Sequence, residues 1–212
     1  MESPLPAQYS APGRALQHSD TPACLPGSGT ALYAAFLHPH RATPMLQHRF
    51  QSPVGPLQVD HQDGVIHALS LARTPEAAGL PLLQLSQPGW AECLQAYFDG
   101  ALDGLQSLPI QPRGTPFQQQ VWQAVRAIPA GQTRAYGQLA ALLGRPAAAR
   151  AVGQALRRNP ILLATPCHRV LPQQGGLGGF AGPEPELQAI KAFLLWHEGC
   201  LPQPPAGFAQ KS

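Results

Sequence analysis

Most segments in the second half of this 212-residue chain have sequence patterns typical of α-helices, and no other feature constrains the fold as strongly. Thr115-Pro116-Phe117-Gln118 combines an N-cap residue, a proline at the first helical position and a glutamine that can reach back to the cap. Apolar residues then recur at helical spacing until Pro129-Ala130-Gly131, where we expect the helix to end. The same patterns predict further helices over about 136–143, 147–158 and 184–197.

A glycine-containing turn, Gly144-Arg145-Pro146, separates the helices predicted at 136–143 and 147–158. Helix, tight turn and helix in this order are typical of a helix-turn-helix. We therefore predict a second domain over 112–201 that is mainly α-helical, followed by a flexible tail at 202–212.

The first half shows short apolar runs between turn signals instead. A turn at 52–56 and an Asp-Gly turn at 60–64 divide residues 49–72 into the strands of a hairpin or meander. A helical pattern over 88–98 stops before Gly100. We predict an α/β fold whose first domain, 46–111, is a small sheet with a helix on it, preceded by a proline-rich, disordered extension at 1–45.

Composition excludes several classes of protein. With 44% hydrophobic residues the chain can bury a core. No run approaches the roughly 18 apolar residues of a membrane-spanning helix, and the start does not resemble a secretory signal. The four cysteines lie far apart with no C-x-x-C pair, which argues against a zinc ribbon or a disulfide scaffold. We expect a cytoplasmic protein with reduced thiols and no membrane partner.

Charge is divided unevenly along the chain. Residues 1–111 hold four basic and eight acidic side chains, whereas residues 112–212 hold ten basic and three acidic ones. A basic half suits a polyanionic partner, and twelve of the fourteen basic residues are arginines, which suit phosphates and bases. A coding bias toward GC-rich codons is the alternative explanation.

Cys167 is the candidate nucleophile. It follows Pro166 at the end of an apolar run and precedes His168 and Arg169. A free thiol with a pKa of about 8.5 is mostly protonated at neutral pH, so a base or a positive charge must activate it, and these neighbours offer both. The alternative is a small buried core residue, which most cysteines are.

The helix at 147–158 presents a polar face formed by Arg150, Gly153, Gln154 and Arg157, opposite an apolar face formed by Ala151, Val152, Ala155 and Leu156. The residues at its start, among them Ala147 and Ala148, have small, uncharged side chains. They allow close contact with DNA but cannot recognise the base sequence. An ordinary helical hairpin with solvated arginines remains open.

The order of these features suggests chemistry on a base. A DNA-binding helix followed by a nucleophile can act only on a base that leaves the stack, and something must fill the gap. Arg150 has a long, cationic side chain near the helix start, and it could therefore fill the gap that the extruded base leaves.

Taken together, five motifs resemble the O6-alkylguanine-DNA alkyltransferases, also called methylated-DNA–protein-cysteine methyltransferases. They are Ile128-Pro-Ala-Gly-Gln-Thr-Arg-Ala-Tyr136, Arg150-Ala-Val-Gly153, Asn159-Pro160, Pro166-Cys-His-Arg-Val170 and His197-Glu-Gly199. The resemblance spans Ser52 to about Leu201. It implies a ribonuclease H-like first domain and a winged-helix-like second domain.

The resemblance also implies site residues. Cys167 would accept the alkyl group, His168 would deprotonate it through a water, Glu198 would orient the imidazole, and Tyr136 would protonate the leaving guanine. Arg150 would be the intercalating finger, and Asn159 would tie the helix-turn-helix to the Cys167 turn. The pocket would be shaped by Val170, Phe180 and Ala181, and DNA would be contacted by Ala147, Ala148, Gly153 and Arg157.

The implied activity is a single-turnover transfer of the alkyl group from flipped O6-alkylguanine in double-stranded DNA to Cys167. It needs no cofactor and no metal, and the protein would be a monomer in the nucleoid, or in the nucleus of a eukaryote. O4-alkylthymine as a second substrate stays open. Scattered histidines such as His61 and His67 are more often surface residues, and with Cys24 they do not make a convincing zinc site.

Three departures from the family pattern concern the start of the DNA-facing helix and the pocket. Ala135 stands where the family usually has serine, Gly182-Pro183 replaces Gly-Gly, and 184–188 resembles an insertion.

Two other functions fit parts of the pattern. One is a binding-only alkyltransferase-like protein, which Cys167 disfavours because such proteins commonly carry tryptophan at this position. The other is a helix-turn-helix regulator with a redox thiol. A thiol hydrolase leaves the basic helix unexplained.

Overall fold

A computed structural model describes residues 44–83, 89–180, 182, 184–205 and 207–208. The predictions for Ala181, for Cys24 and most of the 1–45 extension, and for the end of the tail fall outside these residues. The described chain forms two compact units, 44–112 and 113–208. Among its helices, none is long and apolar enough to cross a membrane.

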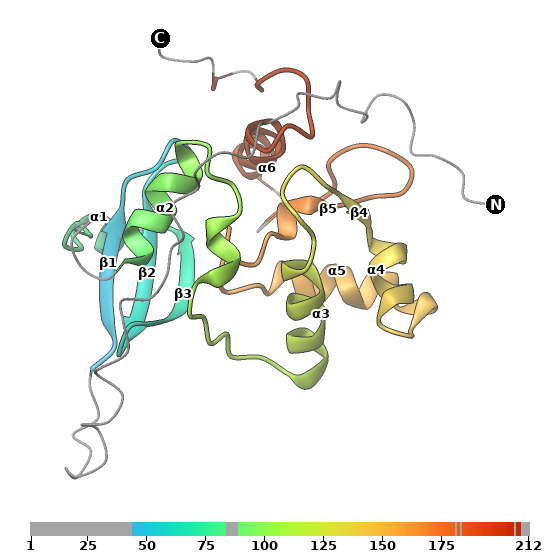
Figure 1. Cartoon of the computed structure of the whole chain (residues 1–212), viewed down its shortest axis with the longest axis horizontal. Helices are drawn as coiled ribbons and strands as arrows, with labels where there is room; N and C mark the ends of the chain where they lie inside the picture. Colours follow the sequence, from blue (N-terminus) through green and yellow to red (C-terminus); the bar gives the residue numbers. More distant parts are fainter. Residues whose placement is uncertain (1–43, 84–88, 181, 183, 206, 209–212) are drawn as a thin grey trace. The chain divides into compact units, whose positions relative to one another are not determined.

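The first unit is built on a three-stranded antiparallel sheet (Figure 1). Its strands β1 (Leu46–Phe50), β2 (Leu57–Gln62) and β3 (Val65–Leu71) pair in the order β1-β2-β3. Asp63 and Gly64, with φ of 51° and 78°, both adopt the left-handed conformation that a tight two-residue hairpin turn requires. The predicted meander with its Asp-Gly turn is therefore confirmed.

A helix packs on this sheet through aromatic side chains. After the short α1 (Pro75–Ala78), α2 (Trp90–Phe98) stacks Phe98 on Phe50 of β1, with ring centroids 6.5 Å apart, and is followed by the 3-10 turn η2 (Gly104–Ser107). Trp90 meets the His61 ring edge-on at 5.0 Å. The expectation of a surface position was wrong for His61, which is 7% exposed and shares a 3.0 Å hydrogen bond with His48.

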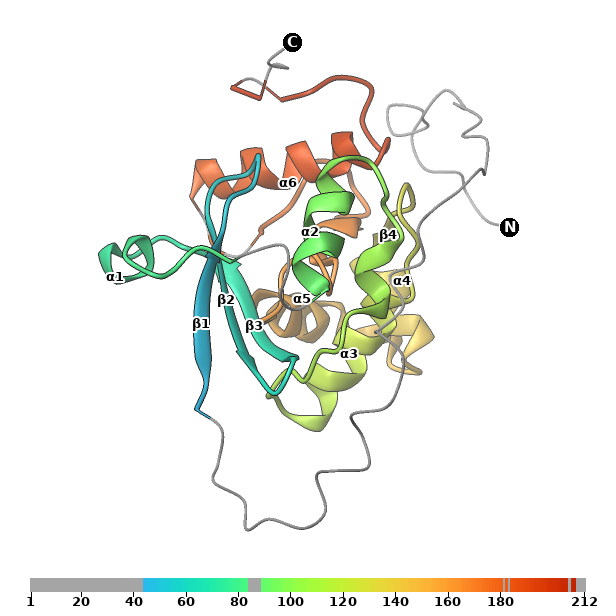
Figure 2. The same cartoon turned by 60° about the vertical axis from the view of Figure 1, so that its left-hand side comes forward.

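The second unit holds the predicted helices (Figures 1 and 2): α3 (Pro116–Arg126), α4 (Tyr136–Leu142), α5 (Ala149–Arg157) and α6 (Pro185–His197). The capping box is present, because Thr115 Oγ1 accepts from the Gln118 amide and Gln118 Oε1 accepts from the Thr115 amide. The helix predicted from 147 begins later, since 146–148 form a 3-10 turn, η3 (Pro146–Ala148).

Between α5 and α6, where no helix was predicted, the described residues form short elements that the sequence did not indicate. These residues contain the 3-10 turn η4 (Cys167–Arg169) and the strand β5 (Val170–Leu171), which pairs in parallel with β4 (Arg134–Ala135). Two-residue strands leave no period in a sequence, so the pattern could not indicate them.

Helices α3, α4 and α5 share one core. The indole of Trp122 on α3 donates to the carbonyl of Ala155 on α5 at 2.9 Å, and Val152, Ala155 and Leu156 face inward as predicted. Ala151 was wrongly assigned to this face, because it is exposed.

Gly114 lies so close to this core that it tolerates no side chain. A Cβ atom there would come within 2.5 Å of the buried Trp122 ring, which cannot move without breaking its bond to Ala155. We expect Gly114→Ala to lower the free energy of unfolding by about 1–3 kcal/mol, the usual effect of overpacking. Urea unfolding measures this. In the control Gly137→Ala, the new Cβ has no neighbour closer than 3.8 Å, so that variant should be at least as stable as the parent.

Candidate active site

Cys167 begins the 3-10 turn η4, which follows a tightly folded apolar segment. Leu163 in this segment has a left-handed backbone, with φ of 65°, a conformation that is strained for leucine. The Cys167 amide donates to the Thr165 carbonyl at 2.8 Å, and the side chain of Cys167 is 7% exposed. Such a turn gives the thiol one fixed direction.

Asn159 links the end of α5 to this turn. Its Nδ2 group donates to the Thr165 carbonyl at 2.9 Å and to the Cys167 sulfur at 3.4 Å, while its Oδ1 accepts from the Ile161 amide at 3.0 Å. A hydrogen bond to sulfur favours the thiolate over the thiol.

Behind the thiol, His168 and Arg169 both bind Glu198. His168 Nε2 lies 2.9 Å from Glu198 Oε1, and Arg169 donates to both carboxylate oxygens at 2.7 Å. Arg169 also donates to the Ile128 carbonyl. The sequence suggested that Arg169 would charge-stabilise the thiolate; its guanidinium instead pairs with the carboxylate.

The protonation states follow from burial. Burial lowers the pKa of His168, against the opposing effect of Glu198, so the imidazole is neutral at pH 7. Burial alone would raise the pKa of Glu198, but His168 and Arg169 hold it well below its ordinary range. The Nδ1 atom of His168 is buried with no hydrogen-bond partner among the described residues, so it is free to accept a proton from a water molecule.

Lys191 is the functional residue that the sequence reasoning missed. It is fully buried on α6, and its ammonium donates to the carbonyl of Val170 at 2.8 Å and to that of Gly179 at 3.4 Å. Burial raises the pKa of Cys167, whereas the Asn159 hydrogen bond and the Lys191 charge lower it. In turn, burial lowers the pKa of Lys191 to about 8. Lys191 lies four residues after Leu187 and so on the buried face of α6, and this spacing is the signal from which its burial could have been predicted.

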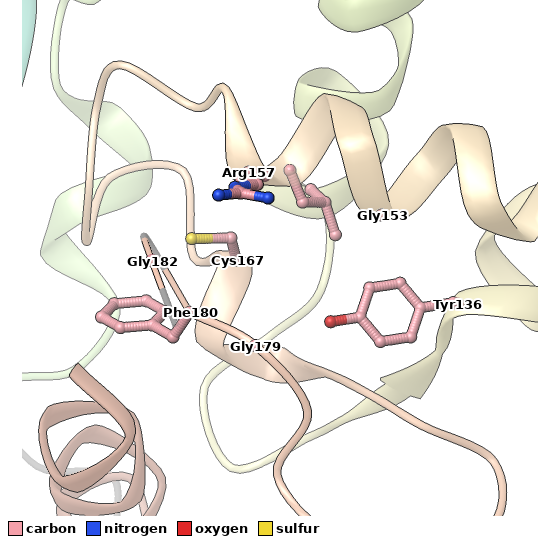
Figure 3. Close-up of a pocket in the computed structure, with 8 residues that line it drawn as sticks. Tyr136, Gly153, Arg157, Cys167, Gly179, Phe180 and Gly182 are labelled. Atoms are coloured by element: carbon pink, nitrogen blue, oxygen red, sulfur yellow. The ribbon is translucent and has the colours of Figure 1, made fainter. Parts of the chain in front are cut away.

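Cys167 opens onto a cavity of about 270 Å³ (Figure 3). The lining combines apolar and small residues with one phenol and one guanidinium: Tyr136, Gly153, Leu156, Arg157, Cys167, Gly179, Phe180 and Gly182. Figure 3 shows the Tyr136 hydroxyl pointing into this space. Burial, and then the nearby Cys167, raise the pKa of Tyr136, so the phenol keeps its proton at neutral pH.

The predicted site residues therefore divide into three groups. Tyr136, Gly153, Arg157, Cys167 and Phe180 meet at the cavity, and Asn159, His168, Val170 and Glu198 lie in the contacts behind it. Ala147, Ala148 and Arg150 do not line it; Arg150 is exposed in the first turn of α5.

The other described cysteines are less suited to nucleophilic chemistry. Burial, reinforced by Glu198, raises the pKa of Cys200 to about 12, and Cys93 is a buried residue of α2 in the other unit. In the described part of the chain, no three His, Cys, Asp or Glu side chains gather where they could hold a metal ion.

Thr165 carries a buried hydroxyl that finds no partner among the described residues, beside the Cys167 turn. A buried hydroxyl that lacks a partner opposes folding, whereas an apolar group of the same shape does not. We expect Thr165→Val to raise the free energy of unfolding by about 1 kcal/mol, measured by urea denaturation. Thr165→Ser, which keeps the hydroxyl and removes the methyl group, should be less stable than the parent. If both variants lost stability equally, the Thr165 hydroxyl would have to form a hydrogen bond, and the premise of this prediction would be wrong.

Comparison with known proteins places this chain in a family. Residues 116–200 match the domain described as 6-O-methylguanine DNA methyltransferase, DNA binding domain. The methylated-DNA–protein-cysteine methyltransferase of Salmonella typhimurium is 41% identical over 172 residues, which cover 74% of this chain and 97% of that protein. The constitutive enzyme of that name from Bacillus subtilis is 41% identical over 152 residues, covering 68% and 90%.

Solved structures give the same result. The O6-methylguanine methyltransferase of Mycobacterium tuberculosis superposes with a TM-score of 0.63 at 33% identity, covering 80% of this chain and 97% of that one. The Mycobacterium tuberculosis OGT in complex with DNA superposes with a TM-score of 0.60 at 34% identity, covering 74% and 94%.

Proposed function

Because this chain belongs to the methylated-DNA–protein-cysteine methyltransferases, DNA-repair proteins that move an alkyl group from DNA onto one of their own cysteines, we propose that Cys167 is its acceptor. The observation that carries this assignment is the position of Cys167. Its side chain lines the cavity, and the next residue in the chain, His168, is bonded to a buried carboxylate.

Before the reaction the thiol and the imidazole are both neutral, so the thiol must lose its proton as it attacks. The free Nδ1 of His168 takes that proton through a water molecule, and Glu198 stabilises the imidazolium that results. Lys191 and Asn159 stabilise the thiolate from the other side. Arg169 keeps Glu198 ionised so that it can act in this way.

Transfer is an in-line displacement at the alkyl carbon. The sulfur forms a bond to this carbon while the bond from carbon to the guanine O6 breaks and its electron pair passes to the base. Tyr136 gives its phenolic proton to the base, and the proton held by His168 returns to the phenolate through solvent. The products are guanine and an S-alkylcysteine. Because the thioether does not hydrolyse at neutral pH, each protein molecule acts once.

The DNA is held by α5 and the turn before it. Ala147 and Ala148 allow close approach to the groove, and Gly153 opens the helix face toward the cavity. Arg150, exposed in the first turn, fills the gap that the extruded base leaves. The substrate is O6-alkylguanine in double-stranded DNA, with O4-alkylthymine as a second base to be tested. The protein acts as a monomer, in the nucleoid or, in a eukaryote, in the nucleus.

We also propose which known folds the two domains adopt. The antiparallel meander followed by α2 supports a ribonuclease H-like domain over 46–111. The helix pair α4 and α5, with the short β4–β5 pair beside it, supports a winged-helix-like domain over 112–201.

Labelled substrate tests the acceptor assignment. Duplex DNA with a radiolabelled methyl group on O6 of guanine should transfer its label to the unmodified protein, and Cys167→Ala should take up none. Cys93→Ala removes an equally buried thiol from the other unit and should retain full transfer. Label on a folded Cys167→Ala protein would refute the assignment.

A further inference from the structure

Tyr136 stands where the chain changes from a strand into a helix. It is the first residue of α4, and β4 ends at the residue before it. β4 pairs in parallel with β5, and β5 directly follows the η4 turn that Cys167 begins. The backbone before Tyr136 is therefore tied to the backbone after the Cys167 turn. How the chain passes from β4 into α4 then decides the direction in which the phenol leaves the backbone.

Gln138, the third residue of α4, caps the start of this helix. The first amides of a helix have no partner within it, and a side-chain acceptor at the N-cap usually binds one of them. The N-cap residue of α4 is Ala135, whose methyl group cannot accept a hydrogen bond. The Oε1 atom of Gln138 accepts from the Ala135 amide at 2.8 Å, which is the reciprocal half of a capping box. Gln138 therefore fixes the backbone of Ala135 against the first turn of α4.

The start of α3 shows the complete form of this cap. There Thr115 and Gln118 each accept from the other's amide. The two N-cap residues have the same extended backbone, with φ of −65° and ψ of 159° at Thr115 and φ of −76° and ψ of 151° at Ala135. Without Gln118, the Thr115 hydroxyl would still cap α3. Without Gln138, the described part of the chain offers α4 no second side-chain cap.

We propose that Gln138 is a positioning residue for Tyr136 and holds the phenol where it can protonate the leaving base. The inference rests on the proposed function, in which Tyr136 is the acid. Gln138 is exposed and does not line the cavity, so it acts through the backbone of α4 and not by contact with the base. A displacement of about 1 Å can cost about 100-fold in rate, so a loosened first turn is enough to slow transfer.

Single-turnover transfer from an O6-methylguanine duplex tests the role of Gln138. Gln138→Ala should slow transfer by about tenfold, because the phenol is no longer held in one place. Gln138→Glu keeps an acceptor oxygen at the same position and should transfer at nearly the parent rate. The matched control is Gln118→Ala, which removes the equivalent 2.8 Å bond at the start of α3, far along the chain from Tyr136, and should leave transfer unchanged.

A double-mutant cycle separates positioning of the phenol from a general structural role. Tyr136→Phe lacks the acid, so adding Gln138→Ala to it should cause little further loss. The loss in the single variant should also be seen with the free base O6-methylguanine at millimolar concentration, because it does not depend on contact with DNA. An equal loss in both backgrounds, a loss confined to the duplex, or unchanged transfer by Gln138→Ala would overturn the proposal. Failure of the unmodified protein to gain a methyl group at Cys167 would instead refute the proposed function.

Discussion

Glu198→Gln will slow alkyl transfer by about 100- to 1,000-fold and lower the free energy of unfolding by about 3–5 kcal/mol. The first effect follows because His168 loses the charge that stabilises its protonated form, and general acid–base catalysis contributes on this scale. The second follows because Arg169, 1% exposed, is left buried without its counter-charge.

Single-turnover kinetics on a methylated duplex and urea unfolding measure the two effects. Glu186→Gln is the matched control: it neutralises an exposed carboxylate in the first turn of the same helix and should change both quantities little. A Glu198→Gln protein with unchanged kinetics would show that the imidazole does not depend on this carboxylate.

Lys191→Met will slow transfer at neutral pH by about tenfold or more, because the pKa of Cys167 rises when the cation that favours its thiolate is removed. Since one pKa unit corresponds to a tenfold change in thiolate population, the rate should recover as the pH rises. The pH profile of the variant should therefore be displaced toward alkaline pH.

The same lysine makes stability depend on pH in a defined direction. Its pKa is about 8 in the folded protein and 10.5 in the unfolded chain, so between these values the unfolded chain binds more protons. The contribution of Lys191 to stability therefore rises with pH across this range, by up to about 3 kcal/mol. The difference in unfolding free energy between Lys191→Met and the parent isolates this contribution from the thiols and tyrosines that also titrate there.

Arg113→Met serves as the control, because it removes a cation at an exposed position. It should leave both the pH profile of transfer and the pH dependence of stability unchanged. An unchanged pH–rate profile in Lys191→Met would exclude this lysine from activation of the thiol.

The sequence predicts local structure best where its signals are local. The Thr115 capping box, the Asp63-Gly64 turn and the helical spacing of α3 to α6 depend on residues a few positions apart, and all are present in the structure. The α5 helix starts later than predicted because Pro146 and the alanines after it form a 3-10 turn first, a difference too small for periodicity to indicate.

Pairings across long stretches of chain could not be derived in the same way. Arg169 meets Glu198 29 residues away, and Lys191 reaches the carbonyl of Val170 21 residues away. The resemblance placed Glu198 beside His168, and the structure has that contact; nothing local indicated that Arg169 would share the carboxylate. Lys191 was overlooked because a lysine on an apolar face is normally expected to extend to solvent.

The most direct test of the account is mass spectrometry of the intact protein, followed by peptide mapping, after reaction with excess O6-methylguanine duplex. We predict a gain of one methyl group per chain, located on Cys167, with an equal amount of guanine restored in the DNA. A methyl group on another residue, or repair of several lesions per chain without any gain in mass, would contradict it.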